Sequence, residues 1–282
     1  MEIKEIIEKV KGFYSGKDYQ GNSIDDLKTR DQVLFGDVTQ ECTGIVTTCY
    51  CSIDVIKEAI EHKANLIICH ESAFYNRGAN TESMNRNKTL VEKRRLLEEH
   101  HIVVWRNHDY IHSGMMNEKN ELTDGIFYGL MKVLAWDKYL IAPIRTPMLF
   151  ELPQTNTEDL CRYLIEKLHL NGIKIIGNRN AVIKKVLIAE HIMGEDDYRK
   201  IEMIEDHDID CVIAMECIDF TVSSYIKDAA ELGQSKVILA VGHFNVEEPG
   251  MDYLAQILKD GIQIDLPVRF VQSGDMYQFI TK

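Results

Sequence analysis

Three stretches of the sequence place imidazole and carboxylate side chains directly after an apolar run. The runs cover residues 66–69, 102–105 and 237–241, and each leads into a polar segment that carries histidine. Buried parallel strands deliver ligands at their carboxyl ends, so these segments are candidates for one shared site. The candidate ligands, in chain order, are His70, Glu71, His112, His243 and Glu247.

The residue types in this group are those that bind divalent transition metals. His243 and Glu247 are four residues apart, which brings both side chains to one face of a helix. Three imidazoles and two carboxylates suit zinc, manganese or iron, and five side chains are more than one tetrahedral ion needs. The set therefore predicts a centre of two divalent transition-metal ions. Such a centre lowers the pKa of a bridging water and makes it a nucleophile for hydrolysis.

Each stretch taken alone has a simpler structural interpretation. His243 is then a residue at a helix end beside an exposed Glu247, and His112 lies in a solvated turn with His108 and Asp109. If the three stretches are not adjacent in the folded chain, the protein is a plain α/β protein without metal.

Strand-like and helix-like segments alternate along the chain and predict an α/β fold with mostly parallel sheets. The expected strands are residues 44–49, 65–69, 102–105, 173–176, 184–189, 211–214, 237–241, 268–271 and 277–280. The expected helices are residues 2–13, 55–60, 88–100, 121–135, 157–168, 196–206, 219–232 and 249–260. Polar loops are expected at residues 72–87 and 106–120. The pattern resets near residues 143–153, so we expect an N-terminal half at 1–145 and a C-terminal half at 146–282, or one interlaced domain.

The composition is ordinary for a globular protein, with 45% apolar and 27% charged residues. The formal net charge of −13 argues against nucleic acid or an anionic membrane as a partner. No segment approaches the ~20 consecutive apolar residues of a spanning helix, and the N-terminal stretch lacks the apolar core of a signal peptide. The seven cysteines are irregularly spaced, which fits reduced, buried thiols. We therefore expect a cytoplasmic protein.

The same stretches resemble the NIF-three-like family (NGG-one-interacting factor three), whose members are often labelled GTP cyclohydrolase of type 2. Residues 64–72 are similar to the family's ADLIITHHP signature, residues 108–112 to its HTNLD segment, and residues 242–247 to its GHxxxE motif. Weaker similarity at residues 31–36 and 267–280 extends the resemblance over nearly the whole chain. It implies a NIF-three-like fold of two similar α/β halves with the metal site between them.

Carried over residue by residue, the resemblance assigns the family's ligands to the five positions named above, with two exchanges. Glu71 stands where the family has a second consecutive histidine, and His112 stands where the family has aspartate. One exchange offsets the other, so the number of imidazoles and the ligand charge are retained. This favours a rearranged metal centre over a lost one. If the alignment is off by a few residues at 108–112, Asp109 is the ligand in place of His112.

Three further residues lie beside the predicted centre. Glu216, in a stretch similar to the family's Thr-Gly-Asp/Glu, either orients a ligating histidine or caps the helix that follows. His108 faces the site and is a candidate donor to substrate. His191 stands where the family is glycine-rich, and its side chain would narrow the cavity. His108 and Glu216 are therefore the candidate catalytic residues.

The resemblance implies a metal-dependent hydrolase or cyclohydrolase that acts on a nucleotide or a small phosphorylated metabolite. The nucleotide rests on the family label alone, because the sequence has no Walker loop or glycine-rich phosphate loop. The alternative is a non-catalytic metal-binding ring scaffold or regulatory protein, so whether the protein is an enzyme stays open. The family also forms homohexamers, which are trimers of dimers with the metal sites facing an internal cavity.

Overall fold

The computed structural model of the protein describes residues 1–75, 84–142, 148–189, 191–194 and 197–280. Two compact units are present: unit 1 comprises Met1–Gly129 and Gly250–Ser273, and unit 2 comprises Leu130–Pro249 and Gly274–Lys282. Each unit contains one five-stranded sheet with its own helices, so the predicted α/β class with two halves is confirmed. The division of the sequence at residue 145 and a site between halves stay predictions.

The sheet of unit 1 runs in the order β1-β4-β3-β2-β12. β2, β3, β4 and β12 are parallel, and only β1 pairs antiparallel at the edge. The strands of the parallel core are short apolar runs in which nearly every residue is buried, because helices cover both faces. Their bounds are β1 Val33–Phe35, β2 Ile45–Thr48, β3 Leu66–Cys69, β4 Val103–Arg106 and β12 Val268–Phe270.

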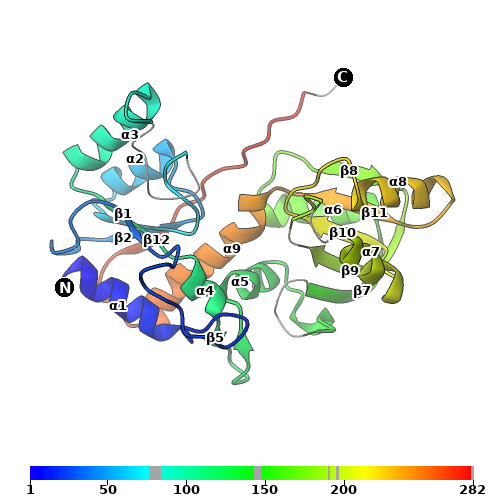
Figure 1. Ribbon diagram of the computed structural model, residues 1–282, viewed down its shortest axis with the longest axis horizontal. Coiled ribbons are helices and arrows are strands. Elements are labelled where there is room, and N and C mark those ends of the chain that lie inside the picture. Colours follow the sequence, from blue (N-terminus) through cyan, green and yellow to red (C-terminus); the bar gives the residue numbers. More distant parts are fainter. Residues whose placement is uncertain (76–83, 143–147, 190, 195–196, 281–282) are drawn as a thin grey trace. The chain divides into compact units, whose positions relative to one another are not determined.

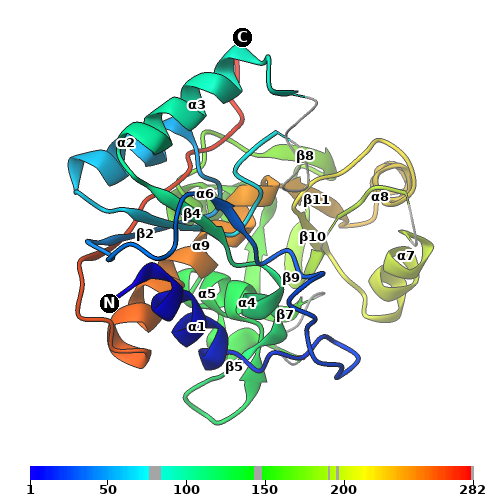
Figure 2. The same cartoon turned by 60° about the vertical axis from the view of Figure 1, so that its left-hand side comes forward.

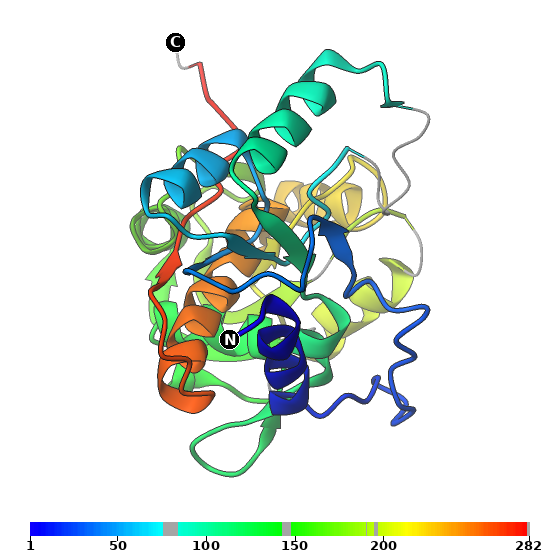
Figure 3. The ribbon, with the colours of Figure 1, turned by 90° about the vertical axis from the view of Figure 1, so that its left-hand side faces the viewer.

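Helices α2 (Ile53–Glu61) and α3 (Lys88–Glu99) pack side by side on one face of this sheet (Figure 3). Each begins at a side-chain cap: Ser52 accepts from the backbone N–H of Val55, and Asn87 accepts from that of Leu90. Helix α1 (Ile3–Phe13) lies on the opposite face and buries its apolar stripe there (Figure 1). The two helix layers exclude water from the strands on both sides.

The segment after β4 differs from the predicted polar loop. It contains a short helix, α4 (Asp109–Ser113), and a hairpin of β5 (Met115–Met116) and β6 (Leu122–Thr123) before α5 (Gly125–Val133). The carboxylate of Asp31 accepts hydrogen bonds from the backbone N–H groups at the N-terminus of α4, so its cap comes from a distant part of the chain. A cap from a residue so far away along the chain is not visible in the local sequence, so the sequence predicts a loop here.

The sheet of unit 2 runs in the order β7-β9-β10-β11-β8, with β9, β10 and β11 parallel and both edge strands antiparallel. Helices α7 and α8 pack together over one face (Figure 2). Edge strand β7 is the one strand of this sheet that the sequence did not predict. The bounds are β7 Met148–Asn156, β8 Lys174–Gly177, β9 Val182–Ala189, β10 Cys211–Ala214, β11 Val237–Ala240, α6 Thr157–Leu168, α7 Asp197–Asp206 and α8 Val222–Glu231.

Two predictions for the C-terminal part of the chain are wrong. The helix expected at residues 249–260 starts earlier, as α9 (His243–Gln256), and continues into a π-helix at Ile257–Gly261. Pro249 lies inside α9, which is why the sequence suggested a later start. Residues 277–280 form no strand, so β12 alone closes the sheet of unit 1. Part of the loop expected at residues 72–87 lies outside the described residues.

Two findings bear on the expectations from composition. All seven cysteines are free thiols, and six of them are buried. Among the residues that the structure describes, no helix is long and apolar enough to cross a membrane.

Candidate metal centre

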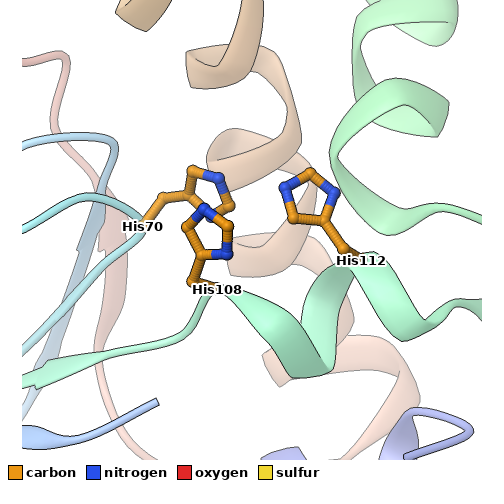
Figure 4. A group of neighbouring side chains, drawn as sticks. All are labelled: His70, His108 and His112. Atoms are coloured by element: carbon orange, nitrogen blue, oxygen red, sulfur yellow. The ribbon is translucent and has the colours of Figure 1, made fainter. Parts of the chain in front are cut away.

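Three imidazole rings gather in unit 1, from His70, His108 and His112 (Figure 4). The ring centroids of His70 and His108 are 4.5 Å apart, and each lies 5.0 Å from that of His112. One nitrogen of each ring lies within 4.8 Å of the others. His70 follows β3, and the other two flank one turn of α4, so the strand ends of the parallel sheet bring the rings together.

The ring of His70 is held in one tautomer by the backbone. Its side chain is buried, and its Nδ1 lies 3.1 Å from the carbonyl oxygen of Asn107. A carbonyl oxygen only accepts, so Nδ1 carries the hydrogen and Nε2 carries the lone pair. This is the form in which a neutral histidine binds a metal ion.

His112 is oriented in the same way by a carboxylate. Its Nδ1 lies 2.8 Å from Oδ2 of Asp124, a buried residue that also accepts from the hydroxyl of Tyr19 at 3.0 Å. The other oxygen of Asp124 accepts from the backbone N–H groups of Ile126 and Phe127 in the first turn of α5. One carboxylate therefore caps a helix and fixes the ring of His112, a pairing typical of metal-ligating histidines.

The two ring nitrogens of His108 face a carboxylate oxygen on one side and a guanidinium group on the other. Its Nδ1 lies 3.0 Å from Oδ1 of Asp109, and its Nε2 lies 3.0 Å from Nη1 of Arg30. A guanidinium only donates, so Nε2 accepts and again carries the lone pair. Burial, together with the neighbouring His70, lowers the pKa of His108 to about 3, so the ring is neutral at pH 7.

Glu71 borders this cluster as one member of an ion pair. Its Oε2 accepts from Nη2 of Arg106 at 2.7 Å, and its Oε1 lies 3.7 Å from Nε2 of His108. Nε of Arg106 also donates to the carbonyl of His70 at 3.0 Å. The predicted ligand Glu71 is therefore an anion next to the three rings, with one oxygen already bound to a guanidinium.

Asp109, the alternative ligand, contacts the loop before β1. Its Oδ2 accepts from the hydroxyl of Thr29 and from the backbone N–H of Arg30, each at 2.9 Å. Burial opposes ionisation of this carboxyl, but its hydrogen bonds with His108 and Arg30 lower its pKa below the ordinary value. The structure thus places His112 in the cluster of rings and uses Asp109 to hold His108 and the Thr29–Arg30 segment.

In unit 2 a second group forms around Glu216, after β10. Its Oε1 lies 3.1 Å from Nδ1 of His243, and its Oε2 lies 3.0 Å from Nδ1 of His191. The centroids of the two rings are 5.1 Å apart. Burial would raise the pKa of Glu216, but its contacts with the two imidazoles lower the pKa to about 2. This carboxylate is ionised and is shared by both rings.

His243 and Glu247 lie together on the first turn of α9, as their spacing predicted. Nε2 of His243 is 3.1 Å from Oε2 of the buried Glu247. Ligand atoms ~2.0–2.2 Å from one tetrahedral or octahedral ion are about 3.0–3.5 Å apart, so this spacing fits two ligands of one ion. Gly242 precedes the pair with φ +101°, and a Cβ there would lie 2.8 Å from the amide of Asn245. Glycine is therefore required at the turn that starts α9.

The donors present fit a divalent transition metal, because they are imidazoles and carboxylates whose orientations are set by neighbouring groups. Of the predicted ligands, His70 and His112 come together in unit 1 with Glu71 at their side, and His243 and Glu247 come together in unit 2. Glu216 lies against His243, where the first of its two predicted roles would place it.

Two members of these groups, His108 and His191, are not among the ligands expected from the sequence. His108 and His112 are four residues apart, which is the spacing of one helical turn, but the polar composition of the segment predicts a loop. His191 was expected only to narrow the cavity, and its partner Glu216 comes from another strand end.

A family model described as Duf34/NIF3 (NGG1p interacting factor 3) matches residues 1–275. A protein of Clostridium acetobutylicum named GTP cyclohydrolase 1 type 2 homolog is 23% identical over 260 residues, which cover 88% of this chain and 89% of that protein. The solved structure of the Staphylococcus aureus hypothetical protein SA1388 has a TM-score of 0.69 at 17% identity and covers 99% of both chains. A Bacillus cereus protein related to NIF3 has a TM-score of 0.66 at 11% identity and also covers 99% of both chains. At such identities the solved structures show the shared fold.

Proposed function

Because the chain belongs to the Duf34/NIF3 (NGG1p interacting factor 3) family, we propose that it is a metal-dependent hydrolase or cyclohydrolase. In this proposal it holds two divalent ions of zinc, manganese or iron and acts on a nucleotide or a small phosphorylated metabolite. The proposed ligands are His70, Glu71, His112, His243 and Glu247.

The observation that carries the proposal is the fixed tautomer of the ligand histidines in unit 1. His70 and His112 each have Nδ1 against an oxygen acceptor, which leaves Nε2 as the nitrogen with the lone pair. A histidine that ligates metal almost always donates its other ring N–H to a carboxylate or a backbone carbonyl, and both rings have this arrangement.

Bound metal would supply a Lewis acid and an activated water. The residues of this chain do the positioning. Asp124 and the Asn107 carbonyl hold the two rings, Glu216 holds His243 through Nδ1, and Arg106 holds Glu71 as an anion. The substrate class is supported by the name of the relative from Clostridium acetobutylicum.

The alternative function is a non-catalytic metal-binding ring scaffold or regulatory protein, assembled as a homohexamer. One observation favours it: the carboxylate of Glu71 is paired with the guanidinium of Arg106 at 2.7 Å. A carboxylate neutralised in this way is a weaker metal ligand than the histidine of the family, which would favour binding without turnover.

The first experiment measures metal per chain in the purified protein by elemental analysis. Native protein is compared with His70→Ala, His112→Ala and, as a matched control at an exposed position, His100→Ala. About two ions per chain, reduced in the first two variants and unchanged in the control, supports the metal centre. No metal after incubation with zinc, manganese or iron contradicts it.

A second experiment separates the enzyme from the scaffold. Metal-loaded protein is assayed for hydrolysis of nucleotides and phosphorylated metabolites, and His243→Ala should abolish turnover while the circular dichroism spectrum stays native. Absence of turnover, together with a hexamer by light scattering that depends on metal, would support the scaffold instead.

A further inference from the structure

The third ring of the cluster in unit 1 is not among the ligands proposed above. His108 is stacked on His70, with an angle of 8° between the ring planes, and its side chain is only 10% exposed. We propose that His108 is itself a metal ligand, so that unit 1 binds one divalent ion through His70, His108 and His112. This inference rests on the metal-binding part of the proposed function and goes beyond its ligand set.

All three rings show the same pattern of support. Nδ1 faces the carbonyl oxygen of Asn107 in His70, a carboxylate oxygen of Asp109 in His108, and a carboxylate oxygen of Asp124 in His112. Three acceptors from three different places in the chain therefore give three rings the same tautomer. In each ring Nε2 is the nitrogen that can coordinate, and a histidine that ligates metal is ordinarily held in this way.

The nitrogens of the group must come closer together to hold an ion. One nitrogen from each ring lies within 4.8 Å of the others. Two nitrogens bound at ~2.0–2.1 Å to a tetrahedral zinc ion are about 3.3–3.4 Å apart. The rings of His70 and His108 are stacked almost parallel, so one of them must also turn about its side-chain bonds before both Nε2 lone pairs meet at one ion. Figure 4 shows the ring of His112 opposite the other two.

The ligand set also indicates which metals fit. Three imidazole nitrogens suit zinc, cobalt, nickel or copper better than manganese or magnesium, which prefer oxygen ligands.

One group competes with the ion. Nη1 of Arg30 lies 3.0 Å from Nε2 of His108 and occupies the lone pair that a metal would need. The side chain of Arg30 is 58% exposed, and its Nε also lies 3.3 Å from Oδ1 of Asp109. The backbone N–H of Arg30 donates to Oδ2 of Asp109, and this hydrogen bond remains when the guanidinium leaves. Arg30 is a competitor for the site, so its removal should strengthen metal binding.

The test uses the full chain with His243→Ala and Glu247→Gln, which removes the ligands of unit 2. This protein is titrated with Co²⁺ and Zn²⁺ in competition with a chelator, and the visible spectrum of bound cobalt reports the number of ligands. In that background His108→Gln should weaken zinc binding about 100-fold or more and shift the cobalt spectrum, because even residues that only orient a ligand contribute 10–100-fold. His100→Gln, at an exposed position, is the matched control and should change neither.

Arg30→Ala should change the zinc affinity in the opposite direction. A loss of folding would not produce an increase in affinity. The variant should tighten zinc binding about threefold to tenfold, since one partly exposed hydrogen bond no longer competes.

Unchanged affinity and an unchanged cobalt spectrum in His108→Gln would overturn the proposal. Unchanged affinity in Arg30→Ala would also overturn it, because Nε2 of His108 would then not be the donor. If the double variant His243→Ala, Glu247→Gln binds no metal while native protein does, the His108 site is contradicted and the proposed function is not. If neither protein binds metal, both proposals are contradicted.

Discussion

The two units hold their histidines in different ways. In unit 1 each of the three rings has its own oxygen acceptor, and one carboxylate, that of Asp124, also caps a helix. In unit 2 the rings of His191 and His243 share one carboxylate, that of Glu216. A separate acceptor for each ring of unit 1 leaves Nε2 as the nitrogen that carries the lone pair, whereas in unit 2 one carboxylate orients both rings.

The two groups also differ in burial. In unit 1 the side chains of His70 and His108 are buried or nearly so, while in unit 2 the side chain of His191 is 45% exposed. Ligands that are held in one orientation and shielded from water bind metal more tightly. The comparison therefore predicts tighter zinc binding in unit 1 than in unit 2. The following predictions would sharpen or break this contrast.

The largest effect is expected from Asp31→Ala in unit 1. The buried carboxylate accepts from the backbone N–H groups of His108, Asp109 and Tyr110, so its loss uncaps α4 and releases two of the three rings. We expect the free energy of unfolding to fall by about 2 kcal/mol, with metal binding lost in unit 1 alone. Urea unfolding and metal titration measure both. Asp37→Ala removes a similar but exposed cap-like contact and is the control; an equal loss in both variants would contradict the assignment.

Asp124→Asn tests the support of His112 with little change of shape. The amide keeps an oxygen for the cap of α5 but loses the charge that holds Nδ1–H of His112. Zinc affinity of unit 1 should fall about 10-fold to 100-fold, as is typical for a group that orients a ligand. Competition titration gives the affinity, and the melting temperature checks the cap. Unchanged affinity would mean that the tautomer of His112 does not depend on Asp124.

Glu216→Gln applies the same change to unit 2. Since Glu216 contacts Nδ1 of His243, metal binding by His243 and Glu247 should weaken about tenfold. His191→Gln should weaken it less than about threefold, because His191 is the more exposed of the two rings. Elemental analysis of variants that lack the unit 1 ligands separates the two. A larger loss in His191→Gln than in Glu216→Gln would identify His191 as a ligand and break the contrast between the units.

The smallest effect concerns pH. Burial lowers the pKa of His108 to about 3 from its ordinary 6.5, so between these values the unfolded chain binds a proton that the folded chain does not. Stability is therefore present above pH 6.5 and is lost as the pH falls below it, by about 1 kcal/mol between pH 6.5 and 5.5. Metal-free native protein should show this loss in urea unfolding, and His108→Gln should not.

Glu216 responds in a different pH range. Its pKa is lowered to about 2, so its contribution is present above its ordinary 4.5 and is lost only as the pH falls from 4.5 towards 2. Glu216→Gln should therefore leave the loss between pH 6.5 and 5.5 unchanged. If it abolished that loss, the pH response would belong to unit 2.

The sequence by itself determined the features that depend on neighbouring residues along the chain. The alternation of apolar strands and amphipathic helices predicted the α/β class, and α6 occupies the predicted range of residues 157–168. The strand ends with His70 and His243 were recognised because a polar pair after an apolar run is a local pattern. The family also followed from these short motifs.

What only the tertiary structure decided were the features that depend on hydrogen bonds between distant residues. α4 exists because Asp31, 77 positions before His108, satisfies its first N–H groups, and this helix brings His108 into the cluster with His70. The tautomer of each ring is set in the same way, by an acceptor whose position is fixed by folding. A buried polar group must find a partner somewhere in the folded chain, and the sequence does not say where.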